Sequence, residues 1–360
     1  MRARVAACLV GMLAGLAAVA ACSRQPPRFV PPNADSSLAV KPDSFAVLVG
    51  MALDQWESDG GAPAAQATAR LLLDDLRRHA DGPLADRART FLDSCGFSAE
   101  VVGGADLMAV NLFSRSDPTG GAWPNLFWRD GESVRLQALE GGGMRLFDVA
   151  ARGADEGGGG SGSDLSQVSA IFGRASNRGQ QPVVIVWRRS AGSNRWALSQ
   201  TLGPDSLGGV GVAEFVPQGA GPVGLEARTY RRTPGFDECA TCPHIHHTLR
   251  FAWARGGWDK ASEETAASPY YAFVQLIAAL SAGDRELAQR LVADPSLLEA
   301  ADRYELGRAK GLWRVAPGTD ESAEEMTFFR GPREAYKVRF APHEGQWMVT
   351  DLQPAQRSIE

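Results

Sequence analysis

The densest group of chemically capable side chains lies between residues 237 and 247, which read Asp-Glu-Cys-Ala-Thr-Cys-Pro-His-Ile-His-His. This stretch holds three of the chain's five histidines and two of its five cysteines. Two residues separate Cys239 from Cys242, a spacing that allows a disulfide, thiol exchange or metal coordination. Thiolates from this pair, with imidazole from His244 or His246, are ligands that zinc or copper accepts. The sequence therefore offers three chemistries for one loop.

The neighbouring residues indicate how these side chains are positioned. Pro234-Gly235 and Pro243 predict that the cysteines lie in a loop. The alternation of side chains after Pro243 predicts a strand. One face of this strand should point inward and carry Ile245, His247, Leu249 and Phe251. His244 and His246 should project together from the other face.

A structural disulfide between Cys239 and Cys242 is the favoured interpretation, and the other two stay open. One Cys-x-x-Cys pair is only half of a zinc ribbon, and four ligands from Cys239 to His246 would be cramped. Redox pairs usually begin a helix in a βαβ context rather than a loop. Pro243 stands where a haem-attachment motif has its histidine. We expect no cofactor, with zinc or copper at Cys239, Cys242, His244 and His246 as the alternative.

The first residues predict export. Arg2 and Arg4 precede an uncharged run from Val5 to Ala21, which ends in the small residues Val19-Ala20-Ala21 before Cys22. A positive start, an apolar run and small residues before a cut are the features of a signal peptide, here residues 1–21. An uncleaved membrane helix is the alternative, but it would not need small residues before a cysteine.

Val19 to Cys22 resembles the lipobox of bacterial lipoproteins, in which the cysteine is acylated and becomes the first residue of the mature chain. The resemblance implies a lipoprotein that carries acyl chains such as palmitate on Cys22. It also implies a location at the cell membrane or outer membrane, lipid-anchored and facing the extracytoplasmic side. An exported protein is located in an oxidising compartment, where disulfides persist, and this favours a Cys239–Cys242 bond. Residues 22–42 are proline-rich and polar, and we expect a semi-rigid tether.

The rest of the chain predicts an α+β protein with N-terminal helices and a β-rich antiparallel body. Residues 43–152 show three helical stripes, punctuated by Gly60-Gly61, Pro63 and Gly82, and then a strand-like period. Residues 153–163 are a Gly/Ser-rich linker or exposed loop, with no lysine and hydroxyl residue placed as a phosphate loop requires. Residues 164–265 read as an antiparallel β domain. Whether residues 43–152 and 164–265 form one domain is left open.

The C-terminal region, residues 268–358, predicts helices followed by strands. Ser268-Pro269, Asp284 and Asp294-Pro295 are helix starts, and Gly283 is a stop. Helices followed by a strand meander resemble the cystatin-like folds, which include the nuclear-transport-factor-like superfamily. The resemblance covers about the last quarter of the chain and rests on Phe273 to Val292, with Ala278-Ala279-Leu280 and the Gly283-Asp284 junction. It implies a C-terminal cystatin-like domain, but no catalytic pattern transfers to identifiable positions.

Composition and motifs narrow the function classes. The formal net charge is −5, and the arginine pairs are scattered, so nucleic acid is not an expected partner. No nucleophile elbow, zinc-protease motif, phosphate loop or dinucleotide fingerprint occurs. His79 and His343 are isolated, while Asp302, Tyr304 and Glu305 could face a cavity of a cystatin-like fold.

Two functional hypotheses follow. The first is a non-enzymatic, lipid-anchored envelope protein that binds or scaffolds a partner protein or a small ligand. The second is a metal-binding or thiol-redox lipoprotein that uses the Cys239/Cys242/His244/His246 cluster. A hydrolase or isomerase acting through a C-terminal cavity is a more distant third.

Overall fold

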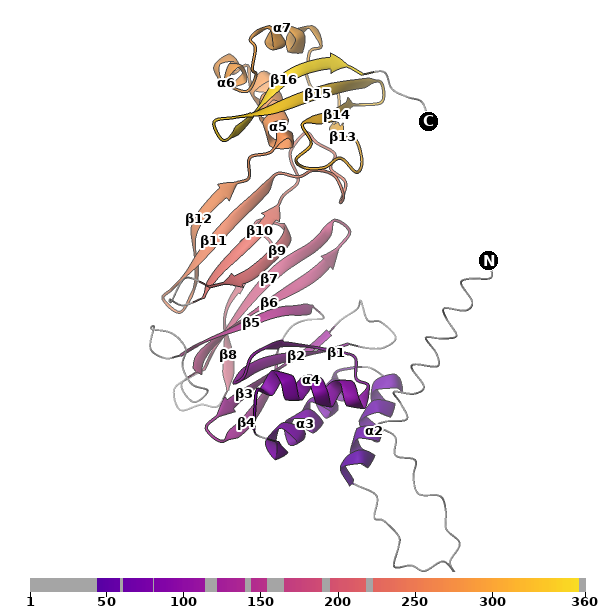
Figure 1. Ribbon diagram of the computed structural model, residues 1–360, viewed down its shortest axis with the longest axis vertical. Helices are drawn as coiled ribbons and strands as arrows, with labels where there is room; N and C mark the ends of the chain where they lie inside the picture. The colour runs from indigo at the N-terminus through magenta and orange to yellow at the C-terminus, as the bar shows by residue number, and fades with distance from the viewer. Residues whose placement is uncertain are drawn as a thin grey trace, which may run out of the picture. The chain divides into compact units, whose positions relative to one another are not determined.

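A computed structural model describes residues 44–58, 61–79, 81–113, 122–139, 144–153, 165–189, 195–217 and 223–355 (Figure 1). The predicted signal peptide, Cys22 and the tether lie outside the described residues, as does nearly all of the Gly/Ser-rich segment. The chain divides into two compact units. Unit 1 comprises the chain up to Arg174 with residues 183–201 and 217–223, and unit 2 comprises residues 175–182, 202–216 and 224 onward.

Unit 1 begins with three helices, α2 (Ser44–Ser58), α3 (Ala62–Arg78) and α4 (Leu84–Cys95). Pro63 lies in the first turn of α3, where its missing N–H is not needed. Gly96 ends α4 in the left-handed conformation, at φ 75°, which favours glycine. These helices match the three predicted stripes. Cys95 is half-buried and packs against the core.

The helices cover one face of an antiparallel sheet in the order β1-β2-β3-β4. Its strands are β1 (Ala99–Gly103), β2 (Leu107–Phe113), β3 (Ala122–Asp130) and β4 (Ser133–Ala138). Successive residues of β2 face opposite sides, so Met108 packs among the helices while Ala109 packs on the other face. Burial on both faces explains why β2 is almost continuously apolar.

A second sheet, in the order β5-β6-β7-β8, packs on the other face of the first. Its strands are β5 (Arg145–Gly153), β6 (Leu165–Ser176), β7 (Gly179–Arg189) and β8 (Trp196–Leu202). Trp128 of β3 and Trp196 of β8 meet edge to face with ring centres 5.6 Å apart. Unit 1 is therefore a helix layer and two sheet layers around two hydrophobic clusters.

Unit 2 contains an antiparallel sheet in the order β12-β11-β10-β9. Its strands are β9 (Val210–Val216), β10 (Gly224–Tyr230), β11 (His246–Ala254) and β12 (Gly257–Thr265). Between β11 and β12 the chain turns through Arg255 and Gly256, and Trp258 packs after the turn, as the hairpin pattern predicts.

The C-terminal part of unit 2 has the predicted order of helices followed by strands. The helices are α5 (Pro269–Ala282), α6 (Arg285–Arg290) and α7 (Ser296–Arg303). The strands are β13 (Trp313–Val315), β14 (Glu325–Arg330), β15 (Glu334–His343) and β16 (Gln346–Pro354), paired antiparallel in that order. Ser268 and Asp284 cap α5 and α6 by accepting backbone N–H bonds, and Gly283 ends α5 at φ 73°.

This C-terminal part has one hydrophobic core, in which α5 packs against the sheet. Phe273 of α5 stacks on Phe328 of β14 with ring centres 3.8 Å apart. A parallel bridge between Val292 and Val349 attaches the segment after α6 to β16. The α+β class with a β-rich body is thus confirmed. Within the described residues, none of the helices combines the length and the apolar character needed to cross a bilayer.

Candidate functional site

The cysteine- and histidine-rich segment forms the connection between β10 and β11, residues 231–245. It is attached to the C-terminal sheet: Asp237 N donates to Trp313 O at 2.7 Å, and Trp313 N donates to Gly235 O at 3.0 Å. Phe236 lies edge to face with Tyr270 and Phe273 of α5. The connection is therefore part of the C-terminal core and not a free surface loop.

Cys239 and Cys242 form a disulfide, with Cα atoms 5.1 Å apart, in agreement with the favoured prediction. Cys239 is exposed, whereas Cys242 is buried in the core with Ile245 and Phe236. In this state the two sulfur atoms are bonded to each other and provide no thiolate for a metal or for exchange. The pair also lies between two strands, not at the start of a helix, where low-pKa redox cysteines usually lie.

Glu238, directly before the disulfide, is the most constrained polar residue of the segment. Its side chain is 4% exposed and accepts hydrogen bonds from Thr233 N at 3.0 Å and from the Tyr270 hydroxyl at 2.8 Å. Burial acts to raise its pKa, but the nearby His244 imidazole and the two donors outweigh burial and hold the pKa below its usual value. Burial and the Glu238 charge raise the pKa of Tyr270, which therefore stays a hydrogen-bond donor.

His244 is buried beside Glu238, with its Nδ1 3.8 Å from a carboxylate oxygen. Its ring lies nearly parallel to that of Tyr230, with centres 3.7 Å apart. Within the described part of the chain, neither ring nitrogen has a hydrogen-bond partner. His244 thus packs as a flat ring inside the molecule, and does not share an outward face with His246 as the alternation predicted.

His246 and His247 begin β11 and have separate acidic partners. His246 Nε2 lies 2.7 Å from Glu321, and His247 Nδ1 lies 3.6 Å from Glu263 and 3.1 Å from the Thr265 hydroxyl. The rings of His244 and His246 are perpendicular, with centres 6.3 Å apart. Among the described residues, no group of three or more His, Cys, Asp or Glu side chains is arranged to hold a metal ion.

Three of the remaining acidic and histidine candidates, His79, Asp302 and Glu305, lie beside charged partners. His79 contacts Asp75 and Arg87, and Asp302 pairs with Arg285 of α6. Glu305 pairs with Arg308 and Lys310, and its pKa is lowered chiefly by the Lys310 hydrogen bond. These contacts account for the positions of the charged side chains without a catalytic role.

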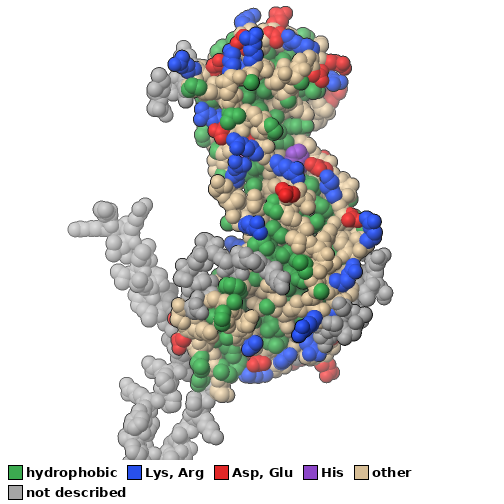
Figure 2. Space-filling view, turned by 180° about the vertical axis from the view of Figure 1, so that it is seen from behind, with side chains coloured by type: hydrophobic (Ala, Val, Ile, Leu, Met, Phe, Trp, Pro, Cys, Tyr) green, Lys and Arg blue, Asp and Glu red, His purple; other side chains and the backbone are tan. Residues whose placement is uncertain are grey.

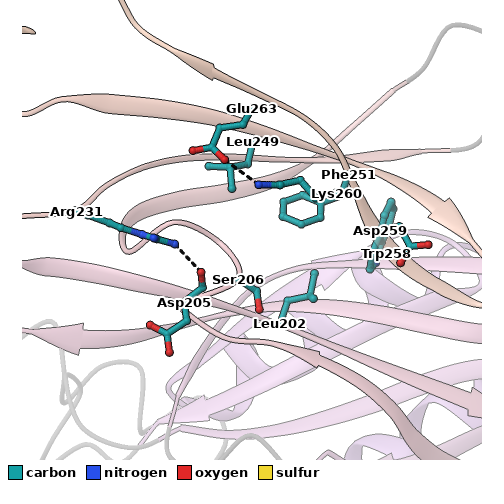
Figure 3. A pocket seen from close by; sticks show the side chains of 10 residues that line it. All are labelled: Leu202, Asp205, Ser206, Arg231, Leu249, Phe251, Trp258, Asp259, Lys260 and Glu263. Carbon is teal, nitrogen blue, oxygen red and sulfur yellow. Dashed lines mark hydrogen bonds and ion pairs between the residues drawn. The ribbon is translucent and has the colours of Figure 1, made fainter.

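A cavity of about 390 Å³ lies on the β9–β12 sheet of unit 2, and sequence reasoning did not identify it (Figure 3). Its base is apolar and its rim is charged. The base is formed by Leu202, Leu249, Phe251 and Trp258, and the rim by Asp205, Ser206, Arg231, Asp259, Lys260 and Glu263. An apolar floor with a few polar groups around it is the usual make-up of a small-molecule site.

One wall of the cavity is the loop between β8 and β9, which is fastened to β10. The Thr229 hydroxyl donates to Leu207 O at 2.7 Å, and Gly209 lies so close to Tyr230 O that a Cβ at this position would overlap it. The backbone of Gly209, at φ 115°, also favours glycine. The loop therefore holds Asp205 and Ser206 at a fixed edge of the cavity.

The charges at the rim are partly paired with one another. Arg231 donates to the backbone oxygen of Asp205 at 2.7 Å, and Lys260 pairs with Glu263 at 2.8 Å (Figure 3). The Lys260 hydrogen bond lowers the pKa of Glu263. The rim thus presents both signs of charge above an apolar base.

Comparisons with protein-family models, with curated proteins and with solved structures give no match to this chain. Two places in the described structure bring chemically capable side chains together: the enclosed β10–β11 connection and the open cavity. The sequence indicated the first through Cys and His spacing. For the cavity it gave only the inward alternation of Leu249 and Phe251 and the tryptophan after the β11–β12 turn.

Proposed function

We propose that this protein is a lipid-anchored, extracytoplasmic bacterial lipoprotein that acts by binding at the cell envelope and not by catalysis. The observation that carries the proposal is the uncharged run that ends in Val19-Ala20-Ala21-Cys22. The Cys239–Cys242 disulfide supports it, because such bonds persist in oxidising compartments outside the cytoplasm.

The anchor is tested by labelling. The full chain is expressed in a bacterium supplied with an alkyne-bearing palmitate, and the label is detected on the purified protein. We expect incorporation that Cys22→Ser abolishes, whereas Cys8→Ser, which removes a cysteine from the middle of the signal, retains it. Labelling that survives Cys22→Ser, or fails in the unaltered chain, would disprove the anchor.

For the binding role, we propose the β9–β12 cavity as the site of a small ligand that combines an apolar ring or chain with a charged group. The apolar base supports the first part and the mixed-charge rim the second. Nucleic acid is not the proposed partner. On the face seen in Figure 2, basic and acidic side chains are interspersed, whereas phosphate binding requires concentrated positive charge.

The cavity is tested with anilinonaphthalene sulfonate, an aromatic anion whose fluorescence reports apolar binding sites. We expect saturable binding at one site in the folded protein. Ser206→Trp should fill the cavity from its rim and abolish this binding. Ser262→Trp, an exposed serine of the same sheet that does not line the cavity, is the matched control. Equal binding by both variants would refute the assignment.

For the C-terminal part we propose a cystatin-like fold. The order of α5 to α7 followed by the β13–β16 meander supports this assignment. An experimental structure in which the sheet does not curve around α5 would contradict it.

The metal-binding or thiol-redox alternative rests on the exposure of Cys239 next to a buried Cys242. Native mass spectrometry with and without alkylation, on protein prepared without chelator, separates it from the binding role. A disulfide that resists alkylation until reduced, with no metal mass, favours the binding role. Reduced cysteines with a stoichiometric metal favour the alternative.

A further inference from the structure

Helix α2 is apolar on two opposite sides. Its inner side packs into the core through Val49, Ala52 and Trp56. Its outer side carries Val47, Leu48 and Met51, which are 48%, 50% and 63% exposed. We call these three residues the outer stripe.

The outer stripe is one continuous patch on the first half of the helix. At 100° per residue, Val47, Met51 and Leu48 fall within an arc of about 100° on the helix surface, and Asp54 borders that arc as an acidic residue. A helix that is apolar on both sides is typical of complete burial or of contact with a membrane. The stripe is exposed, so folding alone does not account for it.

The chain around α2 indicates what covers the stripe. Twenty-one residues separate Cys22 from Ser44, where α2 begins, so even a fully extended tether reaches no more than about 75 Å. Of the described elements, α2 is the one that follows the anchor directly in sequence. An acylated Cys22 would therefore hold this helix at high local concentration beside the bilayer.

Positive charge lies beside the same end of the helix. In the exposed last turn of α3, the Arg78 guanidinium lies 4.1 Å from the ring centre of Phe45, in the first turn of α2. Its neighbour Arg77 is directed elsewhere, because its Nε donates to Val134 O of β4 at 3.1 Å. An apolar stripe with an arginine at the same end of the helix fits an interface with anionic lipids, where apolar insertion and charge attraction act together.

We propose that the outer stripe of α2, with Arg78, lies on an anionic lipid surface and makes a second, reversible contact beside the acylated Cys22. The inference rests on the proposed lipid anchor and adds to it a face of the protein that touches the membrane.

The test uses the unlipidated chain from Ser23 to Glu360, which keeps every described residue. The core cluster to which α2 belongs begins at Phe45. Cosedimentation is measured with vesicles of phosphatidylcholine alone and of phosphatidylcholine with an equal amount of phosphatidylglycerol. We expect stronger binding to the anionic vesicles, reduced about tenfold by Leu48→Gln combined with Met51→Gln. Arg78→Gln should weaken the binding to anionic vesicles only.

Leu198→Gln combined with Val212→Gln is the matched control, because these side chains are 57% and 60% exposed on strands β8 and β9. It should bind as the unaltered chain does. The proposal is overturned if the unaltered chain ignores anionic vesicles, or if the α2 variant binds them equally well. It is also overturned if the stripe mediates a dimer in light scattering while vesicle binding is absent. Since no acyl chain is present, each of these outcomes leaves the Cys22 labelling result unaffected.

Discussion

The β10–β11 connection and the β9–β12 cavity lie in the same unit, yet they use polar residues in opposite ways. In the connection, the Glu238 carboxylate and the His244 ring are 4% and 6% exposed and enclosed by aromatic rings. At the cavity, Lys260 and Glu263 are charged, exposed and paired across an open rim. The residues with the greatest chemical capacity are thus committed to structure, and ordinary surface residues form the available site.

This difference teaches that reactive residue types can lie close together in the sequence without being accessible to a ligand in the folded protein. Short spacing among Cys, His and Glu permits chemistry, but it equally permits a compact polar core. A binding surface can instead be assembled from Leu202, Arg231 and Trp258, which are far apart along the chain.

The largest expected effect comes from removing Glu238. Glu238→Ala leaves the Tyr270 hydroxyl and Thr233 N–H buried without an acceptor, so we expect a loss of about 3 kcal/mol in the free energy of unfolding, measured with urea. Glu321→Gln, which alters an exposed partner of His246, should cost no more than about 1 kcal/mol. If the two variants lose similar amounts of unfolding free energy, the buried Glu238 is no more important for stability than the exposed Glu321.

The disulfide should contribute next. Its loop is short, so Cys239→Ser combined with Cys242→Ser is expected to lower the free energy of unfolding by roughly 2 kcal/mol. Reductant should destabilise the unaltered protein by a similar amount and leave the double variant unchanged. If the double variant instead retains its stability, the connection is held by its packing alone.

The pH dependence distinguishes the two regions further. The pKa of Glu238 is lower in the folded chain than its ordinary value of 4.5, so its stabilisation is complete above that pH and is lost as the pH falls below it. Urea midpoints between neutral and acidic pH should therefore decrease, and Glu238→Gln should make the decrease shallower. The pKa of Glu263 is lowered too, but its side chain is exposed, and Glu263→Gln should change the slope less. The reverse order would contradict the burial argument.

The smallest effect on stability is expected at the cavity rim. Lys260→Met breaks an exposed pair with Glu263 and should change the free energy of unfolding by no more than about 0.5 kcal/mol. The same variant should nevertheless weaken binding of anilinonaphthalene sulfonate, because a positive charge near the sulfonate is lost. If Lys260→Met greatly lowers the free energy of unfolding and leaves dye binding unchanged, Lys260 stabilises the fold and does not bind the ligand.

Local signals in the sequence predicted the elements well. Ser268, Asp284 and Gly283 act on their own helix ends, and each is found in the predicted role. The alternation of Leu249 and Phe251 likewise predicted their buried side of β11. Such features depend on residues a few positions apart, so one sequence contains them.

The arrangement of the candidate site was less accessible to prediction. The Cys239–Cys242 bond followed from spacing, but the burial of His244 depends on Tyr230 and on the C-terminal core that encloses the connection. The cavity depends on how the β8–β9 loop packs over β10. Both result from tertiary packing, which local periodicity does not determine.

The attachment of residues 235–237 to Trp313 also affects the tendency of the protein to aggregate at high concentration. Strand β13 is one edge of the C-terminal sheet, and its backbone groups bond to this connection; at the opposite edge, Val349 of β16 exchanges hydrogen bonds with Leu291 and Ala293. Open sheet edges pair readily with other chains. By covering part of both edges with its own segments, the chain protects its C-terminal sheet from edge-to-edge aggregation.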